Sequence, residues 1–195
     1  MAFELVVVGT SLGGLRALEV LLAGLSKTIP VSMAVVQHRH KDSDGTLSRL
    51  LQQYSALPLK DAEDKEVIVP GRVYLAPADY HLLVEAGRFA LSTEAPVLYA
   101  RPSIDVLFES AADAYAEKVI GVILTGANHD GAQGIAKIKA RGGLTVVQDP
   151  ATAESPSMPE AAIAAVEIDW ILPLLDIAPL LVSLCHPAPD FYNFR

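Results

Sequence analysis

The sequence predicts an α/β fold that has a mostly parallel sheet with an antiparallel hairpin region in its middle. Short apolar, β-branched runs alternate with segments of helical spacing along most of the chain, which is the pattern of an α/β domain. The segment 67–92 replaces this alternation with short strands and Pro-Gly and Ala-Gly turns, which is typical of antiparallel pairing. Because 51% of the 195 residues are hydrophobic and 19% are charged, we expect a sizeable core.

The first half of the chain contains two strand–helix pairs. Leu5 to Val8 and Met33 to Val36 are short and apolar, as buried strands are. Leucines at helical spacing predict a helix after Gly14 and a second helix near 47–54, for which Asp44 is the expected cap. Right-handed crossovers would then place the two strands in one parallel sheet.

The second half returns to alternating helices and strands. Without repeats or a linker, we expect a single domain over residues 1–195, with an irregular tail at about 186–195. The expected helices lie near 104–111, 132–140, 159–165 and 177–185, and the expected strands at 119–124 and 144–148.

Three strand ends supply the side chains of a hydrolytic triad. In an open α/β sheet, chemistry takes place beyond the carboxyl ends of the parallel strands. The first strand leads to Ser11, the second to His38, and the strand at 119–124 to Asp130. A serine nucleophile needs a base, and the base needs a carboxylate that fixes its tautomer. Ser11 also lies in a G-x-S-x-G turn, where the backbone N–H of Leu12 would face a developing oxyanion.

Each of these residues also has a simpler interpretation. Asp130 could merely cap the helix expected at 132–140. The loop Gly9-x-Ser11-x-x-Gly14 is one residue away from a dinucleotide fingerprint, but Gln37 and His38 stand where that fold needs an acid. His38 and His40 form an H-x-H pair, yet no second His/Cys cluster follows, so we expect no metal.

Composition limits the cellular compartment and the classes of partner that we expect. No apolar run reaches the roughly 18 residues of a membrane span, and no signal peptide is evident. The single cysteine, Cys185, excludes an intrachain disulfide and fits a reducing compartment, so we expect a cytoplasmic protein. The formal net charge of −8 argues against generic nucleic-acid binding.

Six stretches along nearly the whole chain follow the pattern of one known family. They are VVVGTSLGGLRALEVLL, VVQH, AEDKEVIVPGRVYLAPADYHL, RPSIDVLFESAA, GVILTGANHDGAQGIAKIKARGG and QDPATAESPSMPEAAI. Together they resemble the catalytic domain of the chemotaxis protein-glutamate methylesterases. The resemblance implies a doubly wound, mostly parallel sheet with helices on both faces and an antiparallel hairpin corner. It assigns the nucleophile to Ser11, the base to His38 and the orienting carboxylate to Asp130.

The resemblance also implies a reaction. Members of this family hydrolyse glutamate γ-methyl esters on the cytoplasmic helices of chemoreceptors and release methanol, and many also deamidate receptor glutamines, without a cofactor. The alternative is a catalytically impaired, methylesterase-like binding module of a chemosensory complex. Four cations could meet an acidic receptor surface, namely Arg16, Arg39, Lys41 and Arg101.

Three departures from the family pattern stand out. The family's aspartate loop reads Gly-Met-Gly-x-Asp-Gly, whereas this chain has Ala127 and Asn128 at the second and third positions. Ala127 can still offer a backbone N–H to the oxyanion, and Asn128 is expected to tolerate the positive φ that a glycine there would imply. Leu12 replaces the usual threonine. We expect no receiver domain before the first strand. The protein is then either a stand-alone enzyme controlled, if at all, by a separate regulatory protein, or a domain of a larger chain.

Overall fold

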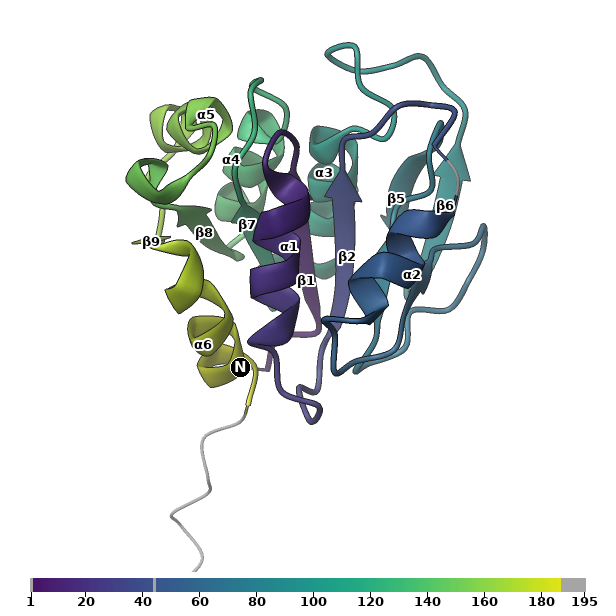
Figure 1. Ribbon diagram of the computed structural model, residues 1–195, viewed down its shortest axis with the longest axis horizontal. Helices are drawn as coiled ribbons and strands as arrows, with labels where there is room; N and C mark the ends of the chain where they lie inside the picture. Colours follow the sequence, from purple (N-terminus) through teal and green to yellow (C-terminus); the bar gives the residue numbers. More distant parts are fainter. Residues whose placement is uncertain (1, 44, 187–195) are drawn as a thin grey trace, which may run out of the picture.

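A seven-stranded parallel sheet forms the centre of the computed structural model, which describes residues 2–43 and 45–186 (Figure 1). The strand order is β3-β4-β2-β1-β7-β8-β9, and all pairings in this sheet are parallel. Because β1 lies between β2 and β7, the chain builds the sheet outward from it in both directions. The strands are β1 (Leu5–Thr10), β2 (Ser32–Gln37), β3 (Leu59–Asp61), β4 (Val73–Leu75), β7 (Val119–Ile123), β8 (Leu144–Gln148) and β9 (Trp170–Leu172).

Helices cover both faces of the sheet, which confirms the doubly wound fold (Figure 1). One face packs against α1 (Gly14–Ala23), α2 (Thr46–Gln52) and α6 (Leu174–Cys185). The other packs against α3 (Ile104–Tyr115), α4 (Ala132–Ala140), α5 (Ser157–Ala165) and the antiparallel hairpin of β5 (His81–Glu85) and β6 (Arg88–Ser92). Two 3₁₀ turns complete the described elements, η1 (Ala116–Lys118) and η2 (Pro150–Thr152).

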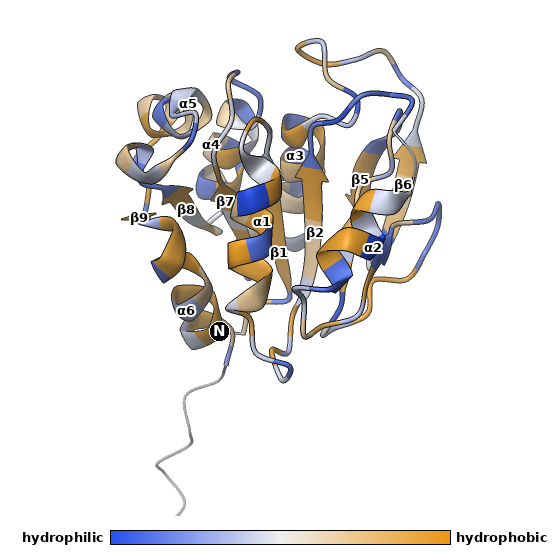
Figure 2. Ribbon diagram, viewed as in Figure 1, coloured by the Kyte–Doolittle hydropathy of each residue, from blue (hydrophilic) through white to orange (hydrophobic). Residues whose placement is uncertain are grey.

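Two apolar cores explain why β1 is central. All six residues of β1 are buried, and successive side chains of a strand point to opposite faces. Leu5 and Val7 therefore enter the core beneath α3 and α4, while Val6 and Val8 enter the core beneath α1 and α6. The strands are accordingly hydrophobic along their length, whereas the helices are hydrophobic mainly on their inner sides (Figure 2).

Parts of the sequence-based assignment were wrong. Strand β4 lies in the segment expected to form hairpins, but it pairs parallel with β2 and β3. The Pro-Gly turn before it is present, yet hydrogen bonds from Gly71 N to Val31 O and from Met33 N to Arg72 O align the following strand with β2. The short strands β3 and β9 were not predicted, since three residues give too little periodicity.

Several expectations fall at the edge of the described chain. Asp44 lies outside the described residues, and so does nearly all of the expected tail, residues 187–195. The N-cap of α2 is Gly45, without a side-chain hydrogen bond. The last helix, α6, begins at Leu174, three residues earlier than expected. The longest described helices have 12 residues, so no described helix could cross a membrane.

Candidate active site

Ser11 lies in a sharp turn between β1 and α1. Gly13, the N-cap of α1, has φ 77°, a left-handed conformation that favours glycine. Hydrogen bonds from Gly14 N to Ser11 O (2.9 Å) and from Ser11 N to Thr125 O (3.0 Å) hold the turn against the end of β7. The serine is partly exposed and lines a cleft of about 560 Å³ together with His38. The turn therefore presents Ser11 at the carboxyl edge of the sheet, as predicted.

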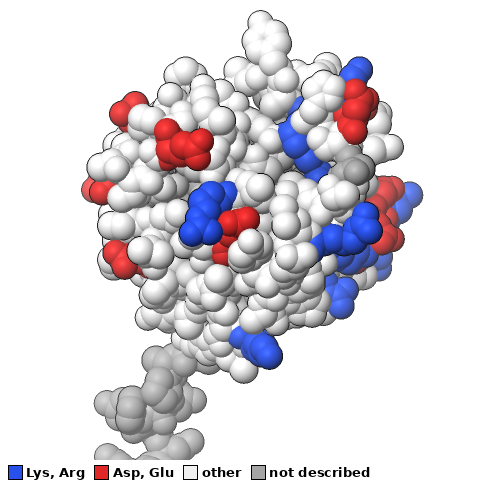
Figure 3. Space-filling view, viewed as in Figure 1, with Lys and Arg blue, Asp and Glu red and all other residues white. Residues whose placement is uncertain are grey.

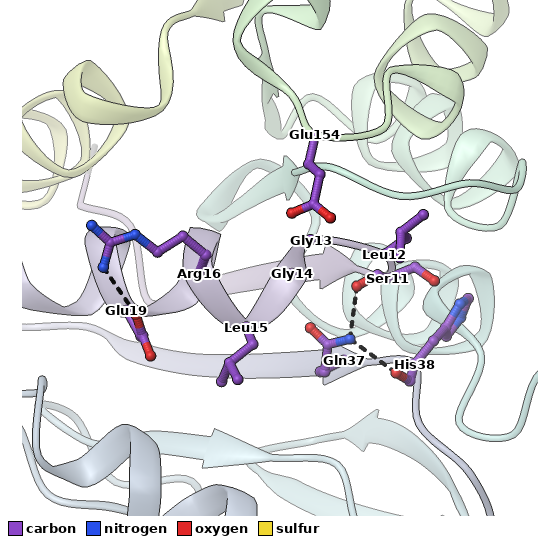
Figure 4. Close-up of a pocket in the computed structure, with 10 residues that line it drawn as sticks. All are labelled: Ser11, Leu12, Gly13, Gly14, Leu15, Arg16, Glu19, Gln37, His38 and Glu154. Atoms are coloured by element: carbon purple, nitrogen blue, oxygen red, sulfur yellow. Dashed lines mark hydrogen bonds and ion pairs between the residues drawn. The ribbon is translucent and has the colours of Figure 1, made fainter.

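A buried glutamine ties Ser11 to His38. The side-chain Nε2 of Gln37, the last residue of β2, donates to Ser11 O and to His38 O, both at 2.9 Å (Figure 4). One amide group thus fixes the main chain of two neighbouring strand ends. In the sequence, Gln37 stood out only because a dinucleotide-binding fold needs an acidic residue at that position. The signal for its role was a polar residue at the end of a buried strand.

The imidazole of His38 is hydrogen-bonded to the carboxylate of Asp130, with 2.8 Å between Nε2 and Oδ2. Asp130 is 1% exposed, and its carboxylate also accepts from Ser103 Oγ (2.9 Å), Ile104 N (2.7 Å) and Asp105 N (2.9 Å). Burial opposes ionisation, but the hydrogen bonds from His38 and from these two backbone groups outweigh it and lower the pKa of Asp130. The carboxylate is therefore charged at neutral pH.

Asp130 and Asp105 each accept hydrogen bonds from the N-terminus of the helix on the other's side. Asp130 precedes α4 but accepts from the first backbone N–H groups of α3. Asp105, in the first turn of α3, accepts in return from Gly131 N (2.9 Å) and Gly134 N (2.7 Å) at the start of α4. Asp130 is thus a helix cap, as the simpler interpretation proposed, but it caps α3 rather than α4. Burial raises the pKa of Asp105 to about 6, against the lowering effect of the two glycine N–H groups, and the charge of Asp130 adds to the increase.

The loop after β7 lies against the serine turn. A methyl group placed on Gly126 would overlap Met158 Sδ and lie 3.0 Å from Ser11 Cβ, so a side chain there would displace Met158 and press against the serine turn. Within the described residues, the backbone N–H groups of Leu12 and Ala127 donate no hydrogen bond. Both N–H groups that were expected to face an oxyanion therefore lack an acceptor among the described residues.

Asn128 contacts the imidazole of His38 directly. Its Nδ2 lies 3.0 Å from His38 Nδ1, and its Oδ1 accepts from Asp130 N at 3.1 Å. The expected positive φ at this position is wrong, since Asn128 has an ordinary backbone conformation. Asparagine fits here because its side chain bonds to the loop that carries it.

Comparison with known proteins identifies the family. The family model described as CheB methylesterase matches residues 6–181. The chain belongs to this family. The crystal structure of the Thermotoga maritima CheB methylesterase catalytic domain superposes with a TM-score of 0.89 at 36% identity, covering 94% of this chain and 100% of that one. The match confirms the predicted fold and the expected enzyme class, a methylesterase.

Relatives of two lengths are found. A Leptospira interrogans protein, provisionally named protein-glutamate methylesterase/protein-glutamine glutaminase, is 48% identical over 185 residues, which cover 94% of this chain and 96% of that protein. Proteins with this name from Moorella thermoacetica and Thermotoga maritima are 39% and 36% identical over 95% and 93% of this chain. The matched regions are 45% and 54% of those two proteins, so the chain spans about half of their length.

A second cleft, of about 510 Å³, opens on the other side of His38. Three of the four cations expected to face an acidic partner line it, namely Arg39, Lys41 and Arg101. Arg39 is largely buried, donates to Ala76 O and lies 3.5 Å from Asp61, and Arg101 binds Asp79. Among the described residues, no partner holds the Lys41 ammonium group. The fourth cation, Arg16, lines the first cleft and pairs with Glu19.

Other potentially reactive groups are occupied or buried. No group of three His, Cys, Asp or Glu side chains within residues 2–43 and 45–186 is arranged to hold a metal ion. His40 lies 3.3 Å from Asp42 on the surface. Cys185 is buried in the core beneath α6, and burial raises the pKa of its thiol to about 12. The thiol is therefore protonated and unreactive at neutral pH.

Replacing Asp105 with asparagine should change how stability depends on pH. The pKa of Asp105, about 6 in the folded protein against an ordinary 3.8, means that the folded state binds more protons between these values. The free energy of unfolding therefore falls as pH rises through this window. Asp105→Asn keeps an acceptor oxygen without the charge, so its urea-unfolding free energy should fall less between about pH 4.5 and about pH 7. An equal fall of the unfolding free energy in both proteins would contradict the assignment of the raised pKa to Asp105. Asp130 does not contribute in this window, because its pKa is lowered.

Replacing Gly126 with alanine should displace Ser11. A displacement of about 1 Å in a reacting group can cost roughly 100-fold in rate. The methyl group requires a smaller shift at Ser11, so labelling of Ser11 by a fluorophosphonate probe should slow severalfold. Adding Met158→Ala makes room for the new methyl group and should restore part of the rate. Labelling of Gly126→Ala at the wild-type rate would show that the loop does not position the serine.

Proposed function

We propose that the chain is a serine hydrolase that removes methyl esters from glutamate side chains of chemoreceptors and releases methanol, with receptor glutamines as a second substrate. The hydrogen bond between His38 and the ionised Asp130 carries this proposal, because it holds an imidazole at the cleft that Ser11 also lines. The names of the relatives supply the substrate class.

The contacts of His38 determine which nitrogen acts as the base. Nε2 is committed to Asp130, so Nδ1 accepts the proton of Ser11 Oγ as the oxygen attacks the ester carbonyl carbon. The imidazolium, stabilised by the Asp130 carboxylate, then gives this proton to the departing methoxide and methanol leaves. A water molecule attacks the acyl-enzyme, and its proton passes through Nδ1 to Ser11. The products are the glutamate carboxylate and free enzyme.

The oxyanion is stabilised at the start of α1. The backbone N–H groups of Leu12 and Ala127, which donate to no described residue, are the proposed donors, and the positive end of the α1 dipole adds to them. The loss of one such donor typically costs about 10²–10³ in kcat. No metal or cofactor takes part in this scheme.

The clefts suit a protein substrate. They flank His38, and the second adds an apolar edge formed by Leu98 and Tyr99, which are 53% and 103% exposed. On the face shown in Figure 3, acidic side chains lie mainly on the α5 side and most basic ones on the side of β2 and α2. We propose that an acidic receptor segment enters on the basic side in the cytoplasm and meets Lys41, whose ammonium group pairs with no described residue.

Ser11→Ala tests the proposal most directly. The variant should fold normally, because the Ser11 side chain is partly exposed, and should lose at least about 10³-fold in methanol release from methylated receptor. Ser26→Ala, which changes a partly exposed serine that does not line the cleft, is the matched control and should keep full activity. Activity of Ser11→Ala above a few per cent would refute the triad. An inactive but receptor-binding wild-type protein would favour the binding module.

Lys41→Glu tests the direction of receptor entry. Reversing the charge should raise KM for methylated receptor several-fold and leave kcat and the hydrolysis of a small neutral ester unchanged. Lys27→Glu, which reverses an exposed charge outside both clefts, is the control. The same KM for both variants would place the receptor elsewhere.

A further inference from the structure

The orientation of the Asn128 amide is fixed by a backbone group. The N–H of Asp130 can only donate, and it lies 3.1 Å from the Asn128 Oδ1. The amide nitrogen, which is also only a donor, therefore faces His38 Nδ1 at 3.0 Å. Nδ1 must accept this bond, so the ring is neutral and its proton sits on Nε2, where it is donated to Asp130 Oδ2. The three hydrogen bonds form a closed circuit that begins and ends at Asp130.

This circuit occupies the atom that the reaction needs. An unprotonated imidazole nitrogen has one lone pair in the ring plane, and on Nδ1 that lone pair is taken by the Asn128 amide. The Ser11 hydroxyl makes no hydrogen bond to any described residue. The imidazolium formed on proton transfer would moreover turn its new N–H toward the N–H of Asn128. The amide thus favours the resting neutral ring and opposes the protonated one.

We propose that Asn128 is a positioning residue that locks His38 in the neutral Nε2–H tautomer and competes with Ser11 for Nδ1, so that acylation requires release of this hydrogen bond. The inference rests on the proposed Ser11–His38 chemistry. It assigns a restraining role to the position where the family pattern has glycine, a residue without a side chain to bind the ring. The rate of this enzyme is accordingly limited by one of its own loops.

Two substitutions with opposite expected effects test the restraint. Asn128→Ala removes the competing donor while Asp130 still holds the tautomer, so kcat for methanol release should rise about fivefold, the effect of one neutral hydrogen bond, with KM unchanged. Asn128→Asp keeps the shape and the bond to Asp130 N but turns an acceptor toward Nδ1. This nitrogen must then carry a proton and cannot act as the base, so kcat should fall more than about tenfold.

A structural role alone predicts a different outcome. If Asn128 merely supported the loop, both substitutions would lower kcat, and that result would overturn the proposal. His129→Ala, an exposed neighbour in the same loop, is the control and should leave kcat unchanged. Asn128 has no positive φ, so alanine is compatible with its backbone.

A spectroscopic measurement on the resting protein is independent of turnover. In ¹⁵N-labelled wild type, NMR should show His38 with its proton on Nε2 and a coupling across the hydrogen bond between Asn128 Nδ2 and His38 Nδ1. The coupling should vanish in Asn128→Ala and the tautomer should persist. Absence of the coupling in the wild type would overturn the inference whatever the activity. A normal coupling together with an active Ser11→Ala variant would refute the proposed mechanism and, with it, the competition.

Discussion

The carboxylate of Asp130 is the constraint on which the site depends. It is almost completely buried, and four donors satisfy it, of which two are backbone N–H groups at the start of α3. A charge so deep in a protein is tolerable only when it is hydrogen-bonded in this way. Asp105 in turn accepts hydrogen bonds from two backbone N–H groups at the start of α4. The two helices therefore cannot shift against each other without exposing a carboxylate, and His38 takes its orientation from that rigid pair.

The sheet brings Ser11 and His38 to the same edge as the loop that carries Asp130. Burial of β1 on both faces makes it the central strand. At its carboxyl end, the connection from β1 leads through α1 to β2, and the connection from the adjacent β7 leads through α4 to β8 on the other side. Loops from β1, β2 and β7 must meet there. Gln37 and Gly126 turn this proximity into fixed geometry, the first through its two hydrogen bonds and the second through the absence of a side chain.

The two clefts beside His38 differ in charge although the chain as a whole is acidic. In the first, Arg16 is outweighed by Glu19 and Glu154, and the side chain of Glu154 points toward Gly13 (Figure 4). The second contains three cations and one carboxylate, that of Asp79. The acidic segment of the proposed substrate would thus be attracted to one side of the histidine only. A carboxylate product formed at Ser11 would lie beside like charges, which favours its release.

The sequence by itself determined the fold class and indicated the candidate site residues, because strand periodicity, the glycine turn and the order of Ser11, His38 and Asp130 are local patterns that a parallel sheet brings to one edge. It did not determine that β4 joins the parallel sheet, since pairing partners depend on contacts distant in the chain. Nor did it reveal that Asp130 caps α3 while Asp105 caps α4, or that Asn128 bonds the ring of His38. Those contacts join residues 25 to 90 positions apart. Only the packing of the helices on the sheet decided them, since side-chain hydrogen bonds of this range have no periodic trace in a sequence.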